Sequence, residues 1–228
     1  MKRSIRTGIF SASFCPGLLR TTLQCQSAMP FPCLTAYRHS TLRCSAWLTA
    51  YRALFTKSAL RPGQTLLVQG SSGGMSTALI QLGHAAGFEI WATSRNDRGR
   101  ALAEKLGAHR TFDFNEKLPG KVQAVIDNIS PASWAHSMAS VARGGTIVIT
   151  GVTTGLKVPL SLLPMVSEQI TVCGSIMGTL QDMKDMMNFI VTSSITPEIG
   201  RVLPMEQAEQ GIRAMWEGCT SGKTVFTR

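Results

Sequence analysis

The sequence predicts an α/β fold in which helices cover both faces of a doubly wound parallel sheet. Short runs of continuous apolar residues alternate with stretches of helical periodicity, and a glycine-rich turn separates the first run from its helix. Strands that are buried on both faces are expected to be apolar throughout. With 44% apolar residues among 228, the chain has the composition of a packed globular protein. We expect this domain at residues 45–195, after an irregular or disordered tail at 1–44 and before a C-terminal segment at 196–228.

The first predicted unit runs from a helix through a strand to a second helix. The stretch "AWLTAYRALFTKSAL" (46–60) has Trp47, Tyr51 and Leu54 at helical spacing, and the turn "RPG" ends it. "TLLVQ" (65–69) is a short apolar strand, the glycines follow, and an apolar helical face continues to Ala86. This order predicts the start of a βαβ unit.

The alternation continues to the end of the chain. Further strands are predicted at 89–94, 110–114, 124–130, 145–152 and 170–176, with a last short strand at 222–228. Helices are predicted from Arg98, from Trp134 to Val141 with a close at Gly144, and after the sixth strand. This last helix carries Met183, Met186, Met187 and Ile190 on one face, and we interpret these side chains as core packing.

The glycines lie in the turn "GSSGGMS" (70–76), between the first strand and its helix. A backbone without Cβ atoms can approach a pyrophosphate closely, and the N–H groups of the following helix then face the anion. An ordinary tight βα turn is the alternative. Because the turn follows a strand and opens a helix, the sequence predicts a Rossmann-type dinucleotide-binding domain.

The end of the second strand is expected to select the cofactor. An acid at that position binds the ribose of NAD, whereas small polar and basic residues accommodate the 2′-phosphate of NADP. Here the strand ends in Ser94 and Arg95, with Arg98 close behind. These residues favour NADP(H), while Asp97 leaves NAD(H) possible. The alternative to a role in cofactor binding is that Arg95 and Arg98 are simply solvated at the start of a helix.

Together these segments carry a family resemblance over Ala46 to Arg228. The long stretch from 46 to 87, with "ATSRN", "LGAHRTFDF", "VIDNIS", "GGTIVITGV", "GSIMGT" and "GKTVFTR", resembles the cofactor-binding half of the medium-chain dehydrogenase/reductases. The nearest branches are the zinc-type alcohol dehydrogenase-like proteins and the quinone oxidoreductases. Ser76 departs from the pattern, because many relatives have a third glycine there.

The resemblance implies hydride transfer between NAD(P)H and a small alcohol, carbonyl, enone or quinone. The alternative is a non-catalytic dinucleotide-binding or interaction module. No catalytic residue is assigned. The cofactor-binding residues that the resemblance implies are Thr49, Gly70, Gly73, Gly74, Met75, Ser94, Arg95, Arg98, Phe114, Asn128, Gly151 and Val152.

Two features of the family, its N-terminal catalytic domain and its zinc ligands, are not expected in this chain. The N-terminal catalytic domain of the family has no counterpart in residues 1–44, so we expect a truncated form. Ser45 stands where zinc members have a cysteine ligand, with Cys44 one residue off. The histidines His39, His84, His109 and His136 lack a metal-binding spacing. We therefore expect no zinc.

The net charge of +10 does not predict a nucleic-acid-binding protein. The first 44 residues hold six Lys and Arg and no acid, so the excess lies in the tail. No motif of a nucleic-acid-binding fold and no membrane-spanning apolar run occurs. We interpret the tail as lacking selected structure, as after a misplaced start or frame, with an organellar transit peptide as the alternative. The location expected is cytoplasmic.

Two surfaces are expected to take part in protein–protein contacts. In the family, the sixth strand often joins two subunits, so Ile170 to Ile176 is the expected homodimer contact. The C-terminal segment resembles the part of the family that returns to the missing domain, and its apolar residues are expected to form an exposed patch. They are Val202, Leu203, Ile212, Met215, Trp216 and Val225.

Overall fold

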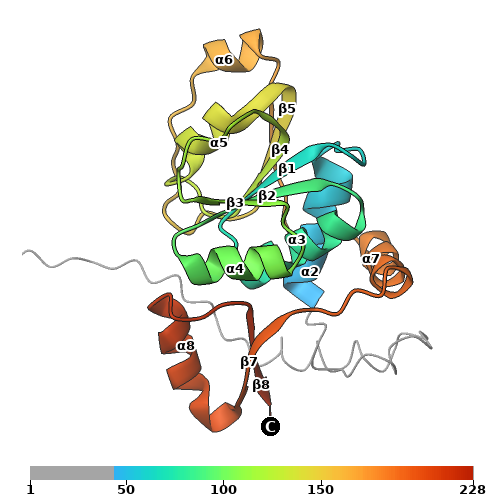
Figure 1. Ribbon diagram of the computed structural model, residues 1–228, viewed down its shortest axis with the longest axis vertical. Helices are drawn as coiled ribbons and strands as arrows, with labels where there is room; N and C mark the ends of the chain where they lie inside the picture. Colours follow the sequence, from blue (N-terminus) through green and yellow to red (C-terminus); the bar gives the residue numbers. More distant parts are fainter. Residues whose placement is uncertain (1–43, 228) are drawn as a thin grey trace, which may run out of the picture. The chain divides into compact units, whose positions relative to one another are not determined.

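The computed structural model describes residues 44–227. The expectations for the N-terminal tail, including the transit peptide and its alternative, lie outside these residues. Six parallel strands form the central sheet in the order β3-β2-β1-β4-β5-β6 (Figure 1). Their bounds are β1 (Thr65–Gln69), β2 (Glu89–Ser94), β3 (Arg110–Asp113), β4 (Val122–Asp127), β5 (Val141–Ile149) and β6 (Thr171–Gly174). The doubly wound parallel sheet is therefore confirmed, with its order reversing between β1 and β4.

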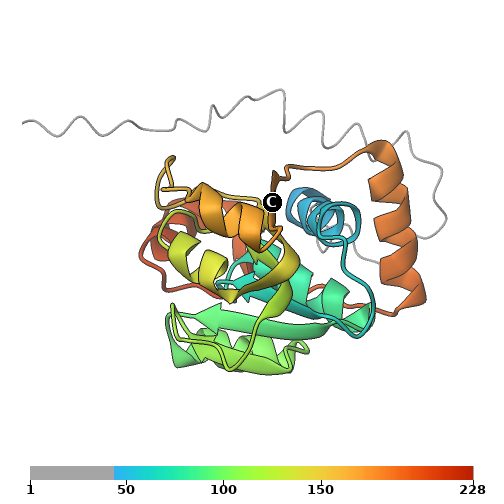
Figure 2. The ribbon, with the colours of Figure 1, turned by 90° about the horizontal axis from the view of Figure 1, so that it is seen from above.

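The helices follow the predicted alternation. Helix α2 (Cys44–Tyr51) continues into a π-helix, η2 (Arg52–Lys57), and packs on α3 and α7 (Figure 2). The remaining helices of this part are α3 (Gly74–Ala85), α4 (Asp97–Lys105), α5 (Trp134–Ser140), α6 (Leu162–Ser167) and α7 (Leu180–Thr192). Helix α5 ends at Ser140, one residue before the predicted Val141, because Val141 already pairs with Val122 in the nine-residue strand β5.

The core lies between the sheet and these helices. Leu66, Leu67 and Val68 of β1 are completely buried, as a strand covered on both faces requires. Among the methionine-rich residues of α7, Met186 and Ile190 are also completely buried. This confirms core packing for Met186 and Ile190, whereas Met183 and Met187 are only half-buried.

Asp182 joins α7 to the first helix. Its carboxylate accepts a hydrogen bond from Arg52 (2.6 Å) and from Thr56 (3.1 Å), and it forms a capping box with Thr179 at the start of α7. Partial burial alone would raise the pKa of Asp182, but the hydrogen bonds from Thr179, Arg52 and Thr56 lower it overall. The carboxylate therefore stabilises both the start of α7 and the contact of η2 with α7.

The C-terminal residues form a second, two-stranded parallel sheet. It consists of β7 (Ile199–Pro204), a 3-10 turn η3 (Met205–Gln207), α8 (Ala208–Trp216) and β8 (Lys223–Thr227). The N–H of Gly222 donates to Ser72 O at 2.8 Å, so β8 begins beside the glycine turn.

The expected apolar patch is present only in part. Val202, Ile212, Met215 and Trp216 are exposed, Trp216 by 91%, but Val225 is buried. Val225 lies in β8, where it pairs with β7. Among the described residues, no helix has the length and apolar character needed to span a bilayer.

Candidate functional site

The glycine turn connects the carboxyl end of β1 to the start of α3. Gly70 has φ +76°, a left-handed conformation that glycine adopts without strain, and its N–H donates to Thr93 Oγ1 at 3.0 Å. Gly73 is the N-cap residue of α3, and no side chain caps the helix. The first helical hydrogen bond of α3 runs from Thr77 N to Gly73 O. The first N–H groups of a helix have no partner within the helix, and since no side chain caps α3, those of Met75 and Ser76 can be offered to an anion, whereas Gly74 lies at the parallel bridge between Gly73 and Gly222.

Gly74 and Ser76, on either side of Met75, belong to the wall of a cleft of about 620 Å³. The wall combines the glycine turn, the carboxyl ends of β2, β3 and β4, and residues of α8 and β8. Seven of the predicted site residues line it: Gly70, Gly73, Gly74, Ser94, Arg95, Phe114 and Asn128. Residues far apart in the sequence thus meet at one place, as the open-sheet rule expects.

The other five predicted residues do not line this cleft. Met75 follows directly in α3, and Arg98 is exposed on α4. A Cβ on Gly151 would lie 2.4 Å from Asn128 O, so this glycine allows close packing beside β4. Val152 is 50% exposed.

Thr49 is held inside the domain rather than at the cleft. It is only 8% exposed, its hydroxyl donates to Ser45 O at 2.8 Å, and it accepts from the N–H of Met177 at 3.2 Å. Both hydroxyl functions are therefore used in joining α2 to the segment after β6.

Lys223 is the cleft residue that sequence reasoning missed. It opens β8, and its Cδ lies 3.0 Å from the position that a Cβ on Gly74 would occupy. An alanine at 74 would therefore crowd the lysine stem. The "GK" dipeptide was visible in the sequence, but nothing there placed it next to a turn about 150 residues earlier.

The electrostatics of the cleft favour an anion. Its lining includes the cations Arg95 and Lys223 and no Asp or Glu. The two acids near the end of β2, Asp97 and Asp113, both form ion pairs with Arg100 and are not part of the wall. The partial positive charge at the start of α3 adds to the two cations.

The side chains in the described part of the chain do not provide a metal site. No group of three or more His, Cys, Asp or Glu side chains among residues 44–227 could hold an ion. The ligand set of a zinc centre is thus not offered by these residues.

Comparison with known proteins places the chain among dehydrogenases. A family model described as "Zinc-binding dehydrogenase" matches residues 74–192. The zinc-type alcohol dehydrogenase-like protein YogA of Leptosphaeria maculans is 29% identical over 193 residues, which are 77% of this chain and 53% of that protein. The quinone oxidoreductase of Mus musculus is 26% identical over 216 residues, 86% of this chain and 63% of that protein.

Solved structures show the same fold. A putative alcohol dehydrogenase from Sinorhizobium meliloti 1021 superimposes with a TM-score of 0.75 at 25% identity, covering 81% of this chain and 53% of that one. The crotonyl-CoA carboxylase/reductase AntE, in complex with NADP, gives a TM-score of 0.79 at 20% identity over 86% and 58% of the two chains. The chain spans little more than half the length of the relatives it matches.

Proposed function

The chain belongs to the zinc-binding dehydrogenase family, and on this basis we propose that it binds NADP(H) in the cleft and transfers hydride to or from a small carbonyl, alcohol, enone or quinone. The observation that carries the proposal is the uncapped start of α3, which faces a cleft with two cations and no carboxylate. Pyrophosphate is the dinucleotide group that such a helix start accommodates.

Each part of the cofactor has residues suited to it. The N–H groups of Met75 and Ser76 at the start of α3 and the ammonium group of Lys223 would hold the pyrophosphate. Ser94, Arg95 and Arg98 would bind the adenosine 2′-phosphate, with Phe114 beside the adenine. The absence of an acid from the end of β2 supports NADP(H) over NAD(H), because a carboxylate there would repel a phosphate.

The chemistry of the reaction would come from the nicotinamide, which donates or accepts the hydride when bound. The residues of this chain would bind and orient the cofactor. We propose that Asn128, Gly151 and Val152, at the carboxyl ends of β4 and β5, lie along the nicotinamide side, with Thr49 behind them. No step is assigned to a metal, because residues 44–227 do not provide the ligands for one.

A fluorescence titration with NADPH and NADH tests the proposal. We expect saturable binding that prefers NADPH. Arg95→Gln should weaken NADPH binding about 10-fold and leave NADH binding unchanged, since one charged hydrogen bond to the 2′-phosphate is lost. Lys223→Met should weaken both cofactors, and Lys184→Met, a change of equal charge at an exposed position on α7, should weaken neither.

The outcomes separate the parts of the proposal. Absence of binding by either cofactor would refute the function, and equal affinity for both would refute the NADP(H) preference. Binding without NADPH oxidation in the presence of quinones or enones would favour the non-catalytic module instead.

We further propose a homodimer through β6. This strand lies at the edge of the sheet, and within residues 44–227 no other strand pairs with its outer side. The segments flanking it in sequence expose large apolar side chains, including Leu163 and Val166 on α6 at 75% each and Ile176 at 82%. Exposed apolar clusters of this kind mark interaction surfaces.

Light scattering of the purified chain tests this contact. Val166→Glu should convert a dimer into a monomer, whereas Trp216→Gln, at an even more exposed site on α8, should remain dimeric. A monomeric unsubstituted chain would contradict the dimer.

A further inference from the structure

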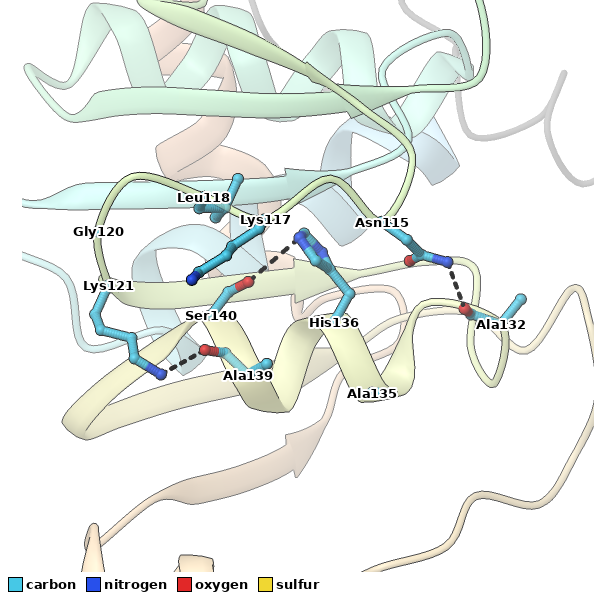
Figure 3. Close-up of a pocket in the computed structure, with 10 residues that line it drawn as sticks. All are labelled: Asn115, Lys117, Leu118, Gly120, Lys121, Ala132, Ala135, His136, Ala139 and Ser140. Carbon is cyan, nitrogen blue, oxygen red and sulfur yellow. Dashed lines mark hydrogen bonds between the residues drawn. The ribbon is translucent and has the colours of Figure 1, made fainter.

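A second cavity, of about 570 Å³, lies between helix α5 and the loop that joins β3 to β4 (Figure 3). Apart from Ala132, its lining shares no residue with the cofactor cleft. Lys121 precedes β4 and Ser140 ends α5, so this part of the cavity is at the amino end of β4. The cofactor cleft is at the carboxyl end, and the two sites are therefore distinct.

The polar groups of the cavity favour an anion. Lys117, Lys121 and His136 line it together with the hydroxyl of Ser140, and no Asp or Glu does. Lys117 forms no hydrogen bond or ion pair with any described residue. Figure 3 shows its side chain running along the cavity beside Ser140, with Lys121 at the same end. Lys121 donates to Ala139 O in the last turn of α5, which leaves two of its three N–H groups for a ligand.

His136 connects this cavity to a buried hydrogen-bond network. Its Nε2 lies 2.7 Å from Glu116 O, a group that only accepts, so Nε2 carries the proton. Its Nδ1 lies 2.8 Å from Gln69 Nε2, an amide nitrogen that only donates. The ring also lies 3.5 Å from Ser140 Oγ, so it bridges the cavity and the network.

The direction of the network is fixed by a buried carboxylate. Asp127 accepts the proton of Ser137 Oγ at 2.7 Å, so Ser137 must in turn accept from Gln69 Nε2 at 3.0 Å. This assigns the amide orientation of Gln69, whose Oε1 accepts from Thr93 Oγ1 at 2.9 Å. Thr93 then accepts the N–H of Gly70. A continuous series of hydrogen bonds, buried between Thr93, Gln69 and Ser137, thus leads from the glycine turn to the imidazole of His136.

We propose that the cavity binds a small oxyanion, the phosphate or carboxylate group of a metabolite, between Lys117, Lys121 and Ser140, and that this site is coupled to the glycine turn through His136 and Gln69. An oxyanion at Ser140 offers a second acceptor beside the Nε2 proton of His136. A shift of the ring toward it pulls on Gln69, the residue directly before Gly70. Because coupling between two sites is reciprocal, a ligand at the glycine turn changes the anion affinity by the same factor.

Binding of the anion is tested by NMR without any cofactor. The imidazole signals of His136, assigned with His136→Gln, are followed during titration with inorganic phosphate or acetate at constant ionic strength set with chloride. We expect a saturable shift that disappears in the Lys117→Met, Lys121→Met double variant and persists in Lys184→Met. Saturation by phosphate alone would identify a phosphate site, and saturation by acetate alone a carboxylate site. A shift that does not saturate, or that survives in the double variant, would overturn the site.

Coupling is tested separately, and this arm rests on the proposed NADP(H) binding. Phosphate also competes with NADPH at the cleft. The effect of phosphate on NADPH affinity is therefore compared between the unsubstituted chain and the double lysine variant, because this competition is the same in both proteins. We expect saturating phosphate to change the NADPH affinity about 5-fold more in the unsubstituted chain. An identical response of the two proteins would refute the coupling and leave the NMR result on the site unaffected. Absence of NADPH binding to either protein would refute the proposed function and the coupling together.

Discussion

Asp127→Asn is the substitution that most directly tests the buried network. Asp127 is completely buried, and its carboxylate accepts hydrogen bonds from the N–H groups of Ile129 and Ser130 and from the hydroxyls of Ser133 and Ser137. Asparagine has the same shape but is neutral, and it presents an N–H where one oxygen was.

The expected cost follows from these contacts. Hydrogen bonds to a charged group contribute about 1 kcal/mol more than neutral ones, and about three of them persist to the amide oxygen. The new N–H faces Ser137, which already accepts from Gln69, so the Ser137 proton loses its acceptor at a cost of about 1–3 kcal/mol. Part of this is offset because a neutral amide is cheaper to bury than a carboxylate. We expect a net destabilisation of about 3 kcal/mol.

Urea unfolding followed by circular dichroism measures this change. With an m-value of about 2 kcal/mol/M, the midpoint of Asp127→Asn should fall by about 1.5 M. Ser137→Ala alone should cost about 1–2 kcal/mol, but in the Asp127→Asn background it removes the hydroxyl that lost its acceptor and should cost almost nothing. Strict additivity of the two substitutions, or an unchanged midpoint for Asp127→Asn, would refute the network.

Two further substitutions address other parts of the fold. A Cβ on Gly211 would lie 2.9 Å from Leu203 and Phe226, so Gly211→Ala should destabilise the packing of α8 on β7 and β8 by about 1–3 kcal/mol. Hydrogen exchange should accelerate in β7 and β8 but not in β1, and unchanged protection would contradict this. The hydrogen bonds to Asp182 lower its pKa overall, so its stabilising effect is complete above the unfolded carboxyl pKa of about 4 and is lost as the pH falls through the lower folded value. Asp182→Asn should therefore lower the urea midpoint at neutral pH and reduce the loss of stability on acidification. If stability falls as steeply with decreasing pH in the variant as in the unsubstituted chain, the stabilising role of the Asp182 carboxylate is contradicted.

The elements predicted correctly are those whose sequence pattern follows from burial. The strands β1 and β4 are continuous apolar runs because helices cover both faces of the sheet. Helix α6 was not predicted, and the structure shows why, since none of its residues is buried and no periodic apolar face marks it. The early end of α5 depends on the pairing of Val141 with β4, a contact with no local signal.

The residues of the cleft likewise divide into those that a local sequence pattern reveals and those that only tertiary contacts bring there. The turn at 70–74 could be found because strand, glycines and helix are consecutive in the sequence. Lys223 could not, because it reaches the turn only through the pairing of β7 with β8 and the hydrogen bond from Gly222 to Ser72. Sequence patterns reveal contacts within a unit, whereas this residue comes from a separate sheet.

The glycines of the turn have different physical tasks. Gly70 is needed for its left-handed conformation, and its N–H is used internally by Thr93, so it is not available to a ligand. Gly73 has an ordinary extended backbone, and a Cβ there would meet only Ser76 Oγ at 4.0 Å, so its missing side chain keeps the start of α3 open. Ser76, where relatives often have glycine, is 1% exposed and accepts a hydrogen bond from Asn128 Nδ2 at 3.0 Å. The departure from the family pattern is therefore accommodated by a partner, and it fixes the amide of Asn128 at the wall of the cleft.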